Sequence, residues 1–351
     1  MIMNKKQRIK ACIHHENVDL VPWQINYTSD LAERLMHELG LDCGFSDVLG
    51  ENVLKYNVLD DFFDNHIAYI RNRSVRSYSE VSPGVFQDEW GVMWDRTIDK
   101  DIGIPVNIVL GNPTTEDLKI PDPDTDERYL HAAPIIRANS GRYIVSKFSY
   151  SLFERAWSLR GMQNMMTDFL ENPSFVNELF DLITGFNLRV MKNLQQFSID
   201  AIQFGDDWGS QNGLLIDPST WRTFIKPRLK LMYNQAHAQG YDVIIHSCGD
   251  ISCILDDLVE IGVDVYNPFQ PEVVDQNRLM INYSGKLAFY GGISLQHTLP
   301  LGSPSDVQQE VSDLLNLADR YGGLIISPSH DMTPDVPLNN IQAMLGVIFN
   351  R

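Results

Sequence analysis

An imidazole and a thiol stand one residue apart in the stretch DVIIHSCGDIS, residues 242–252. His246 and Cys248 are two positions apart, and side chains with that spacing point to the same face of an extended segment. Zinc binds imidazole nitrogen and thiolate sulfur at about 2.0–2.3 Å in tetrahedral geometry. The pair therefore supplies two ligands for a zinc ion, and we expect a third ligand from another part of the chain.

His330, in the stretch SPSHDM at 327–332, is the best-placed candidate for that third ligand. Three protein ligands with one open position are typical of catalytic zinc rather than structural zinc. The alternative needs no metal: Cys248 packs as a small buried hydrophobe, and His330 handles protons or binds a substrate.

The elements that must position these residues follow a regular pattern in the second half of the chain. Short runs that are apolar on both faces alternate with longer helical patterns, which is typical of buried parallel strands in βαβ units. We expect strands at 142–150, 200–206, 241–247, 263–268, 287–292 and 324–329. We expect helices at 173–196, 218–240 and 304–323, and the last two begin with Pro-Ser and end with Gly, as capped helices do.

This alternation predicts an α/β fold, for which an open doubly wound sheet and a (β/α)8 TIM barrel compete. No Gly-x-Gly-x-x-Gly follows an early strand, so a dinucleotide-binding sheet has no support. The number of strand–helix units and the length of 351 residues favour the barrel. We expect its first strand at 18–27, an inserted hairpin and loops over one barrel mouth at about 60–125, and one domain over 1–351.

Polar or conformationally special residues follow five of these strands, those at 200–206, 241–247, 263–268, 287–292 and 324–329, where a barrel carries its chemistry. These residues are Asp206, Asp207, Trp208, His246, Cys248, Asp250, Asn267, Phe269, Gln270, Gly291, Gly292, His330 and Asp331. Two adjacent carboxylates are costly unless a positive or protic group meets them, so we expect a site role for Asp206 or Asp207. The alternative is that this pair caps the next segment.

The composition excludes several classes of function. With 28 Lys and Arg against 46 Asp and Glu, the net charge of −18 makes binding to nucleic acid or to an anionic membrane surface unfavourable. The N-terminus lacks the apolar region of a secretory signal, and no apolar run approaches the roughly 20 residues of a membrane span. Cys12, Cys43 and Cys253 are expected to pack, and the cysteine spacing predicts reduced thiols in the cytoplasm.

Several ordered motifs in residues 140–351 resemble the uroporphyrinogen decarboxylase superfamily. They are the stretch from DDWGSQNG to HSCGDI at 206–251, LVEIGVDVYNPFQP, FYGGIS and SPSHDMTPDVPLNNIQAM. A weaker similarity reaches the N-terminal part through VDLVPW and QDEWG. The resemblance implies a single-domain (β/α)8 barrel whose site lies at the C-terminal mouth.

The superfamily has two main branches, and the motifs bear on the choice between them. True decarboxylases use no metal and hold a polycarboxylate tetrapyrrole with arginines of an Arg-Gln-x-Gly-Arg motif, whereas the corresponding stretch here is WQINYTSD, without arginine. Corrinoid-linked methyltransferases carry a His-x-Cys pair and a later Cys as zinc ligands. His246 and Cys248 match the pair, and His330 stands where the later Cys is expected.

The leading hypothesis is a zinc-dependent methyltransferase that works with a separate corrinoid protein. The chain moves a methyl group between that corrinoid and a small thiol, folate or methoxy- or methylamine-type substrate. The zinc ligands are His246, Cys248 and His330, while Asp206 and Asp207 orient the substrate or relay a proton. The expected substrate-binding residues are Glu89, Trp90, Tyr150, Arg155, Trp208, Asn267 and Gln270, with Trp90 and Trp208 as an apolar lid.

Two other hypotheses remain open on the sequence. In the first, the chain is a metal-free decarboxylase in which His330 and Asp206 handle protons. In the second, it is a binding component that docks a corrinoid protein through the barrel mouth and the 60–125 insertion, without turnover of its own. Chelation separates the first hypothesis from the zinc enzyme, and turnover by the isolated chain separates the second.

Overall fold

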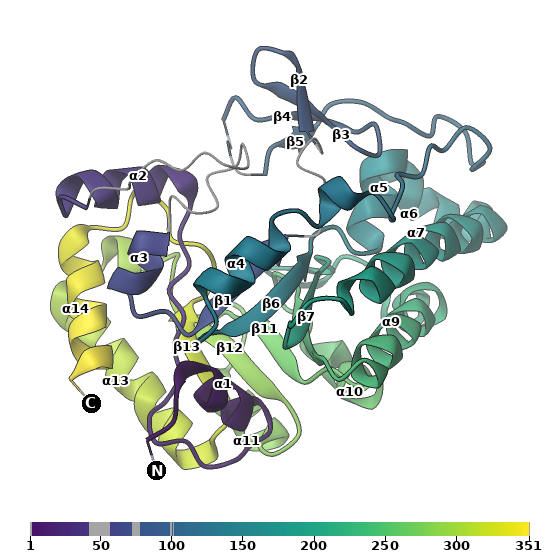
Figure 1. Ribbon diagram of the computed structural model, residues 1–351. Helices are drawn as coiled ribbons and strands as arrows, with labels where there is room; N and C mark the ends of the chain where they lie inside the picture. The colour runs from purple at the N-terminus through teal and green to yellow at the C-terminus, as the bar shows by residue number, and fades with distance from the viewer. Residues whose placement is uncertain (1, 42–56, 72–77, 99, 101, 351) are drawn as a thin grey trace.

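Seven parallel strands curl into a barrel in the computed structural model, which describes residues 2–41, 57–71, 78–98, 100 and 102–350. The hydrogen-bonded order is β1-β6-β7-β10-β11-β12-β13, with every neighbouring pair parallel, so the predicted barrel fold is confirmed (Figure 1). The strands are β1 (Ile67–Arg71), β6 (Tyr143–Phe148), β7 (Ala201–Gly205), β10 (Asp242–His246), β11 (Val265–Phe269), β12 (Ala288–Ile293) and β13 (Leu324–Pro328).

The predicted first strand, 18–27, occupies the gap between β13 and β1. On one side it pairs with the barrel through a parallel bridge between Trp23 and Ile326. On the side toward β1, the side chain of Asn65 makes the hydrogen bonds that a neighbouring strand would make. The Ile25 N–H donates to Asn65 Oδ1 at 2.8 Å, and Asn65 Nδ2 donates to the Ile25 carbonyl at 3.0 Å. The barrel is therefore closed in part by an asparagine, which satisfies backbone groups that a regular strand would pair.

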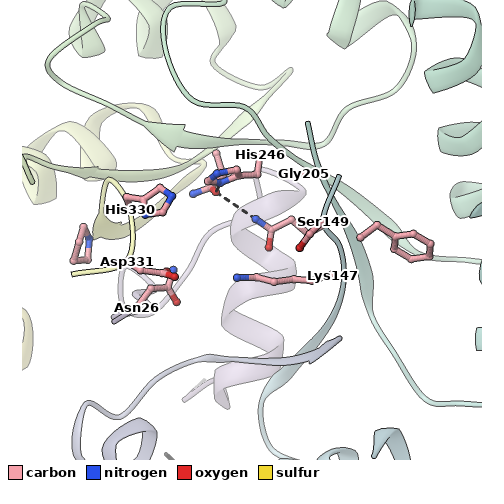
Figure 2. Close-up of a pocket in the computed structure, with 11 residues that line it drawn as sticks. Asn26, Lys147, Ser149, Gly205, His246, His330 and Asp331 are labelled. Atoms are coloured by element: carbon pink, nitrogen blue, oxygen red, sulfur yellow. Dashed lines mark hydrogen bonds between the residues drawn. The ribbon is translucent and has the colours of Figure 1, made fainter. Parts of the chain in front are cut away.

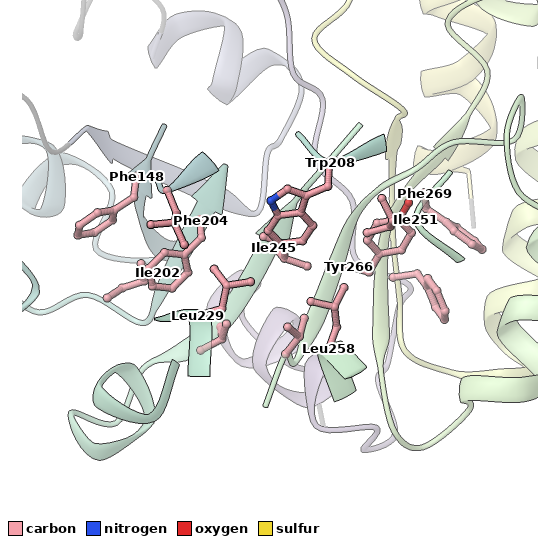
Figure 3. Close-up of a cluster of buried hydrophobic side chains, with 14 of the residues drawn as sticks. Phe148, Ile202, Phe204, Trp208, Leu229, Ile245, Ile251, Leu258, Tyr266 and Phe269 are labelled. Atoms are coloured by element: carbon pink, nitrogen blue, oxygen red, sulfur yellow. The ribbon is translucent and has the colours of Figure 1, made fainter. Parts of the chain in front are cut away.

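Alternate residues of each strand face the barrel interior and the surrounding helices. On β7, Ala201 packs inside the barrel, whereas Ile202 and Phe204 pack outward. Figure 3 shows this outer layer, in which Leu229 and Leu258 come from two covering helices. The alternation leaves every second residue of a strand pointing inward, and at the C-terminal ends those inward positions line the site.

Helices surround the strands, and one helix closes the barrel from below. Ile9, Cys12 and Ile13 of α1 (Lys5–Ile13) pack against the inward residues at the N-terminal ends of the strands. The main outer helices are α7 (Pro173–Leu194), α9 (Lys226–Ala238), α10 (Leu255–Glu260), α11 (Gln276–Tyr283), α13 (Pro304–Tyr321) and α14 (Leu338–Phe349). None of the helices that the described residues form is both long and apolar enough to cross a lipid bilayer.

The remaining helices join these elements or flank the barrel mouth. They are α2 (Ser29–Glu38), α3 (Asn57–Phe62), α4 (Ala132–Ala138), α5 (Phe153–Arg160), α6 (Met162–Glu171) and α12 (Thr298–Leu301). The predicted helix at 218–240 is composite: a short turn, α8 (Pro218–Thr220), and a π-helical turn at 221–225 precede α9. Pro227 accounts for the irregular turn, since proline offers no N–H to the preceding turn and its ring displaces the carbonyl there.

The predicted insertion at 60–125 contains a separate four-stranded antiparallel sheet. Figure 1 shows this sheet at the top of the view, apart from the barrel strands. It consists of β2 (Tyr78–Ser82), β3 (Val85–Asp88), β4 (Met93–Asp95) and β5 (Ile104–Pro105). The lower bound of the insertion is wrong, because β1 at 67–71 is a barrel strand. Its apolar run is too short to be told from a loop segment by periodicity.

The cysteines outside the site differ from one another. Cys12 is buried under the barrel, as expected of a packing residue. Cys253 is exposed, so the expectation that it packs is wrong. It lies in a one-turn helix at 252–254, in which Ile254 is the buried residue. Cys43 lies outside the described residues.

Candidate metal centre

Two strand ends bring His246, Cys248 and His330 together. His246 is the last residue of β10, Cys248 follows two positions later, and His330 comes two residues after the end of β13. One donor atom of each residue lies within 4.8 Å of the donor atoms of the other two. Cys248 Sγ is 3.5 Å from His246 Nε2, and the two imidazole rings are 5.5 Å apart.

These separations fit a tetrahedral zinc ion. Ligand bonds of about 2.0–2.3 Å at tetrahedral angles place neighbouring donor atoms roughly 3.3–3.6 Å apart. The 3.5 Å between Cys248 Sγ and His246 Nε2 already has this value. His330 meets the same requirement after a side-chain movement of about 1 Å, since 4.8 Å is the outer limit of the cluster. The donor set of two imidazoles and one thiolate is one that zinc accepts.

Asn267 sets the orientation and the tautomer of His246. Asn267 Oδ1 lies 2.6 Å from His246 Nδ1, and Asn267 Nδ2 donates to the Tyr290 carbonyl at 2.9 Å. The second bond makes Oδ1 the atom that faces the imidazole, so Nδ1 must carry the proton. Nε2 is left as a lone-pair donor directed at Cys248, which is the arrangement of a metal-binding histidine.

The loop that carries Cys248 is held by two of the predicted site residues. Asp207 Oδ1 accepts the Cys248 N–H, and Gln270 Oε1 accepts the Gly249 N–H, both at 2.8 Å. Gly249 has φ +83°, and a side chain there would collide with the backbone of Gly209. Glycine therefore permits the close approach of two loops at this point, and the hydrogen bonds fix the position of the thiol.

Two of the donor groups, Cys248 and His246, have pKa values that are shifted toward their neutral forms. Burial raises the pKa of the Cys248 thiol, and the charges of Asp207 and Glu154 raise it further. Burial lowers the pKa of His246, which disfavours the imidazolium. Burial and the neighbouring carboxylates also raise the pKa of Glu154 well above its usual range. A neutral imidazole suits metal binding directly, whereas the thiol must lose its proton when a metal binds.

A cavity of about 130 Å³ opens beside the three donor residues. Figure 2 shows His246 and His330 on one side of it, and Lys147, Asp331 and Asn26 on the other. The residues that line it are Asn26, Lys147, Phe148, Ser149, Gln203, Gly205, His246, Asn267, Pro328, His330 and Asp331. A small molecule in this cavity therefore contacts two of the three candidate ligands.

Several residues that line the cavity were not predicted from the sequence. Lys147 and Gln203 lie inside expected strands, two residues after the inward-facing Val145 and Ala201, and therefore on the same face in the alternation of the strand. That alternation was the available signal, because a polar residue in phase with an interior row must enter the barrel near its end. Asn26 gave no such signal, since its segment pairs through isolated bridges and lacks a regular strand phase.

Asp206 lies under a helix rather than in the cavity. Its buried carboxylate accepts the backbone N–H groups of Phe153 at 3.0 Å and of Glu154 at 2.7 Å, at the start of α5. It also accepts the indole N–H of Trp208 at 2.7 Å. Burial raises the pKa of Asp206 to about 6, although these donors act in the opposite direction. Asp206 therefore caps the start of α5, a helix that precedes it in the chain, and not the next segment, as the alternative had it; Asp207 lies beside the thiol.

The predicted apolar lid is absent from the described residues around the cavity. Trp208 is fully buried and packs edge-on against Trp221, within the cluster of Figure 3. Trp90 is also buried and packs against Phe186 on α7. The lid expectation is wrong for both residues, because each indole is covered by a helix that only the folded chain brings near.

The other predicted wall residues belong to a buried ionic layer beneath the insertion. Glu89 pairs with Arg128 through two hydrogen bonds of 3.0 and 2.6 Å. Arg155 donates to Asp88 at 2.6 Å. The Arg155 guanidinium also lies 5.3 Å from the centre of the Tyr150 ring. None of Glu89, Tyr150 and Arg155 is among the residues that line the described cavity. Their charges and rings fasten the antiparallel sheet to α5.

Comparisons with known proteins agree with this architecture. Residues 101–349 match the family model described as Uroporphyrinogen decarboxylase (URO-D). A methyltransferase from Methanosarcina mazei superposes with a TM-score of 0.77 at 16% identity, over 99% of each chain. A search of curated proteins finds no match.

Other solved structures resemble the chain less. A sugar phosphate isomerase/epimerase from Parabacteroides distasonis gives a TM-score of 0.44 at 9% identity, over 95% of this chain and 96% of that one. A rutinosidase from Aspergillus niger gives 0.45 at 10% identity, over 94% and 98%. At these identities the comparisons with structures concern the fold alone.

Proposed function

The chain belongs to the uroporphyrinogen decarboxylase family, and from this premise we propose that it is a zinc-dependent methyltransferase that works with a separate corrinoid protein. The observation that carries the proposal is the convergence of His246, Cys248 and His330 within 4.8 Å at the barrel mouth. A metal-free enzyme has no need of a thiol placed 3.5 Å from an imidazole lone pair. The similarity of the fold to a methyltransferase from Methanosarcina mazei also supports the proposal.

The three side chains hold the metal, and their neighbours keep them in place. When bound, zinc acts as a Lewis acid that favours the deprotonated form of a small ligand in the remaining position. Asn267 keeps Nε2 of His246 free of a proton, and Gln270 holds the loop that carries Cys248. Asp207, which accepts the Cys248 N–H, is a carboxylate beside the reacting group that can take up its proton.

The cavity limits what the small substrate can be. Ligand pockets for drug-sized molecules span about 300–1,000 Å³, whereas the cavity beside His246 and His330 holds about 130 Å³. A small thiol or the methylated end of a larger donor suits this volume better than a tetrapyrrole. Among the described residues that line the cavity there is no arginine, and Lys147 is the lysine. A polycarboxylate substrate of the decarboxylase type is therefore poorly matched here.

The corrinoid is expected on a partner protein. In our proposal the partner would present its corrinoid at the open C-terminal mouth, where the corrinoid would serve as the donor or the acceptor of the methyl group that a substrate in the cavity takes up or gives. The direction of transfer depends on the small substrate, which is a thiol, a folate or a methoxy or methylamine compound.

Metal content provides the first test. We expect elemental mass spectrometry to find about one zinc per chain in the wild type and none in Cys248→Ala. Cys253→Ala is the matched control, because Cys253 is exposed and lies outside the cluster. We also expect chelation to abolish methyl transfer from methylcobalamin to a thiol. Wild-type protein that contains no metal and takes up none when zinc is added would overturn the proposal.

A further inference from the structure

Gln203 places a buried amide at the wall of the cavity, beside the candidate metal centre. It lies on β7 two residues after Ala201, which packs inside the barrel, so the Gln203 side chain also points inward. Its exposed fraction is 5%. Gln203 lines the same cavity as His246 and His330. A molecule held beside those two imidazoles therefore lies close to this amide.

The nitrogen of the Gln203 amide has a partner within the barrel. Gln203 Nε2 donates to Asn267 Oδ1 at 3.3 Å. The orientation of Asn267 is fixed, because its Nδ2 donates to the Tyr290 carbonyl at 2.9 Å and its Oδ1 lies 2.6 Å from Nδ1 of His246. Asn267 therefore offers an oxygen to Gln203, and Gln203 must turn its nitrogen toward that oxygen. The direction in which the Gln203 oxygen points is set by this contact.

The oxygen of the same amide has no partner. Among the residues that the structure describes, none donates a hydrogen bond to Gln203 Oε1, and this atom is shielded from solvent. Asn267, the other buried amide at the cavity wall, has partners for both its oxygen and its nitrogen. A buried acceptor without a donor is costly, and the large majority of such atoms in folded proteins are paired. The unpaired oxygen of Gln203 therefore indicates a donor that comes from a bound molecule.

We propose that Gln203 is a specificity-determining residue whose Oε1 accepts a hydrogen bond from a hydroxyl or amine group of the small molecule in the cavity. The terminal torsion of a glutamine side chain is soft, so a small rotation presents Oε1 to that donor. An engineered cavity of about 150 Å³ holds benzene, so the 130 Å³ here suits a ligand of about six non-hydrogen atoms. The reaction at the other end of the ligand rests on the proposed function, but the acceptor itself requires no metal.

This inference narrows the substrates that the proposed function leaves open. An ether or thioether with an apolar far end would leave Gln203 Oε1 unpaired, whereas a molecule of the same size with a hydroxyl or amine there would pair it. A site that is built to hydrogen-bond a ligand group rejects an analogue without that group more strongly than an apolar pocket rejects an added methylene. Gln203 should therefore select ligands by the donor that they carry rather than by their size.

The experiment uses zinc-free Cys248→Ala protein as the background, so that its result does not depend on the metal. The probes are 3-methoxy-1-propanol, 1-methoxybutane and 3-methoxypropylamine, which have equal numbers of non-hydrogen atoms and differ in the terminal group of the chain. Isothermal titration calorimetry gives their Kd values. NMR of protein labelled with nitrogen-15 glutamine follows the side-chain amide of Gln203. Gln203→Met is then added to the background, with exposed Gln308→Met as the matched control, and thermal unfolding verifies that each variant is folded.

We expect the alcohol or the amine to bind about 3- to 10-fold more tightly than the ether, which is the worth of one hydrogen bond between neutral groups. The tighter ligand should also shift the side-chain amide resonance of Gln203 more than the ether does. Preference for the alcohol identifies a hydroxyl as the recognised donor, and preference for the amine identifies an amine. Gln203→Met should abolish the preference, and Gln308→Met should retain it.

Three results would each overturn the inference. They are equal Kd values for the three probes, tighter binding of the ether than of both donors, and a donor preference that persists in folded Gln203→Met protein. If Gln203→Met does not fold, the amide resonance of Gln203 in the background protein decides, because a residue with a purely structural role would respond equally to the three probes. Zinc is absent throughout, so a failure of the metal proposal would leave these outcomes unchanged.

Discussion

Replacement of Asn267 by leucine tests how the barrel prepares His246 for a metal. Leucine keeps a similar branched shape but removes the Oδ1 that lies 2.6 Å from His246 Nδ1 and the Nδ2 that donates to the Tyr290 carbonyl. His246 then loses the contact that fixes its tautomer, and a larger share of the rings presents a protonated Nε2 to the metal. Hydrogen-bond partners of metal-binding histidines are typically worth about 10- to 100-fold in metal affinity. We expect the zinc Kd of Asn267→Leu to rise by that factor, about 1.4–2.7 kcal/mol.

The assay is a competitive zinc titration against a chromophoric chelator, with the free energy of unfolding of the metal-free protein measured in parallel. Asn277→Leu, at an exposed position on α11, is the matched control and should leave the Kd unchanged. The substitution of Asn267 also leaves the buried Tyr290 carbonyl without this donor, which costs about 1–3 kcal/mol of stability. A wild-type Kd in folded Asn267→Leu protein would refute the argument that this asparagine orients the ligand.

Two further predictions concern stability. We expect Asp206→Ala to lower the free energy of unfolding by about 2–3 kcal/mol in urea denaturation, because buried donors of α5 and Trp208 lose their acceptor. The zinc content of this variant should equal that of the wild type. An Asp206→Ala protein with wild-type stability would contradict the capping role. Burial lowers the pKa of His66 to about 3, so the unfolded chain binds more protons between pH 3 and about 6.5, and stability falls as the pH drops through that window. Between pH 6.5 and 5 the loss should be about 2 kcal/mol, and His66→Gln should abolish it; equal pH slopes for both proteins would show that His66 is not its source.

The barrel and the His-x-Cys pair were predictable because both depend on local patterns. Each of the six expected strands of the second half forms, since a buried parallel strand needs an apolar run that is visible in the sequence. The pairing of His246 with Cys248 on one face follows from the period of an extended chain, and the two side chains do meet. The barrel strand at 67–71 was not recognised, because its short run resembles many loop segments.

The roles of the other polar residues were decided by contacts between distant parts of the chain. Asp206 and Asp207 are neighbours in sequence, yet one caps α5 and the other holds the Cys248 loop, because the two carboxylates point to different elements. Trp208 follows a strand end as a lid residue would, but it is buried and packs against Trp221 in the turn that precedes α9. Sequence position alone indicates that such residues lie near the mouth and does not indicate which partner each of them meets.

The sequence by itself determined the alternation of strands and helices, the end of the barrel where polar side chains gather, and the spacing of one donor pair. These features depend on backbone period and on apolar burial, which act over a few residues. Only the tertiary structure brought His330 to within 4.8 Å of that pair, turned Asn267 toward His246 and carried Lys147 into the cavity. Those arrangements depend on barrel closure, which places side chains from strands far apart in the chain around one point.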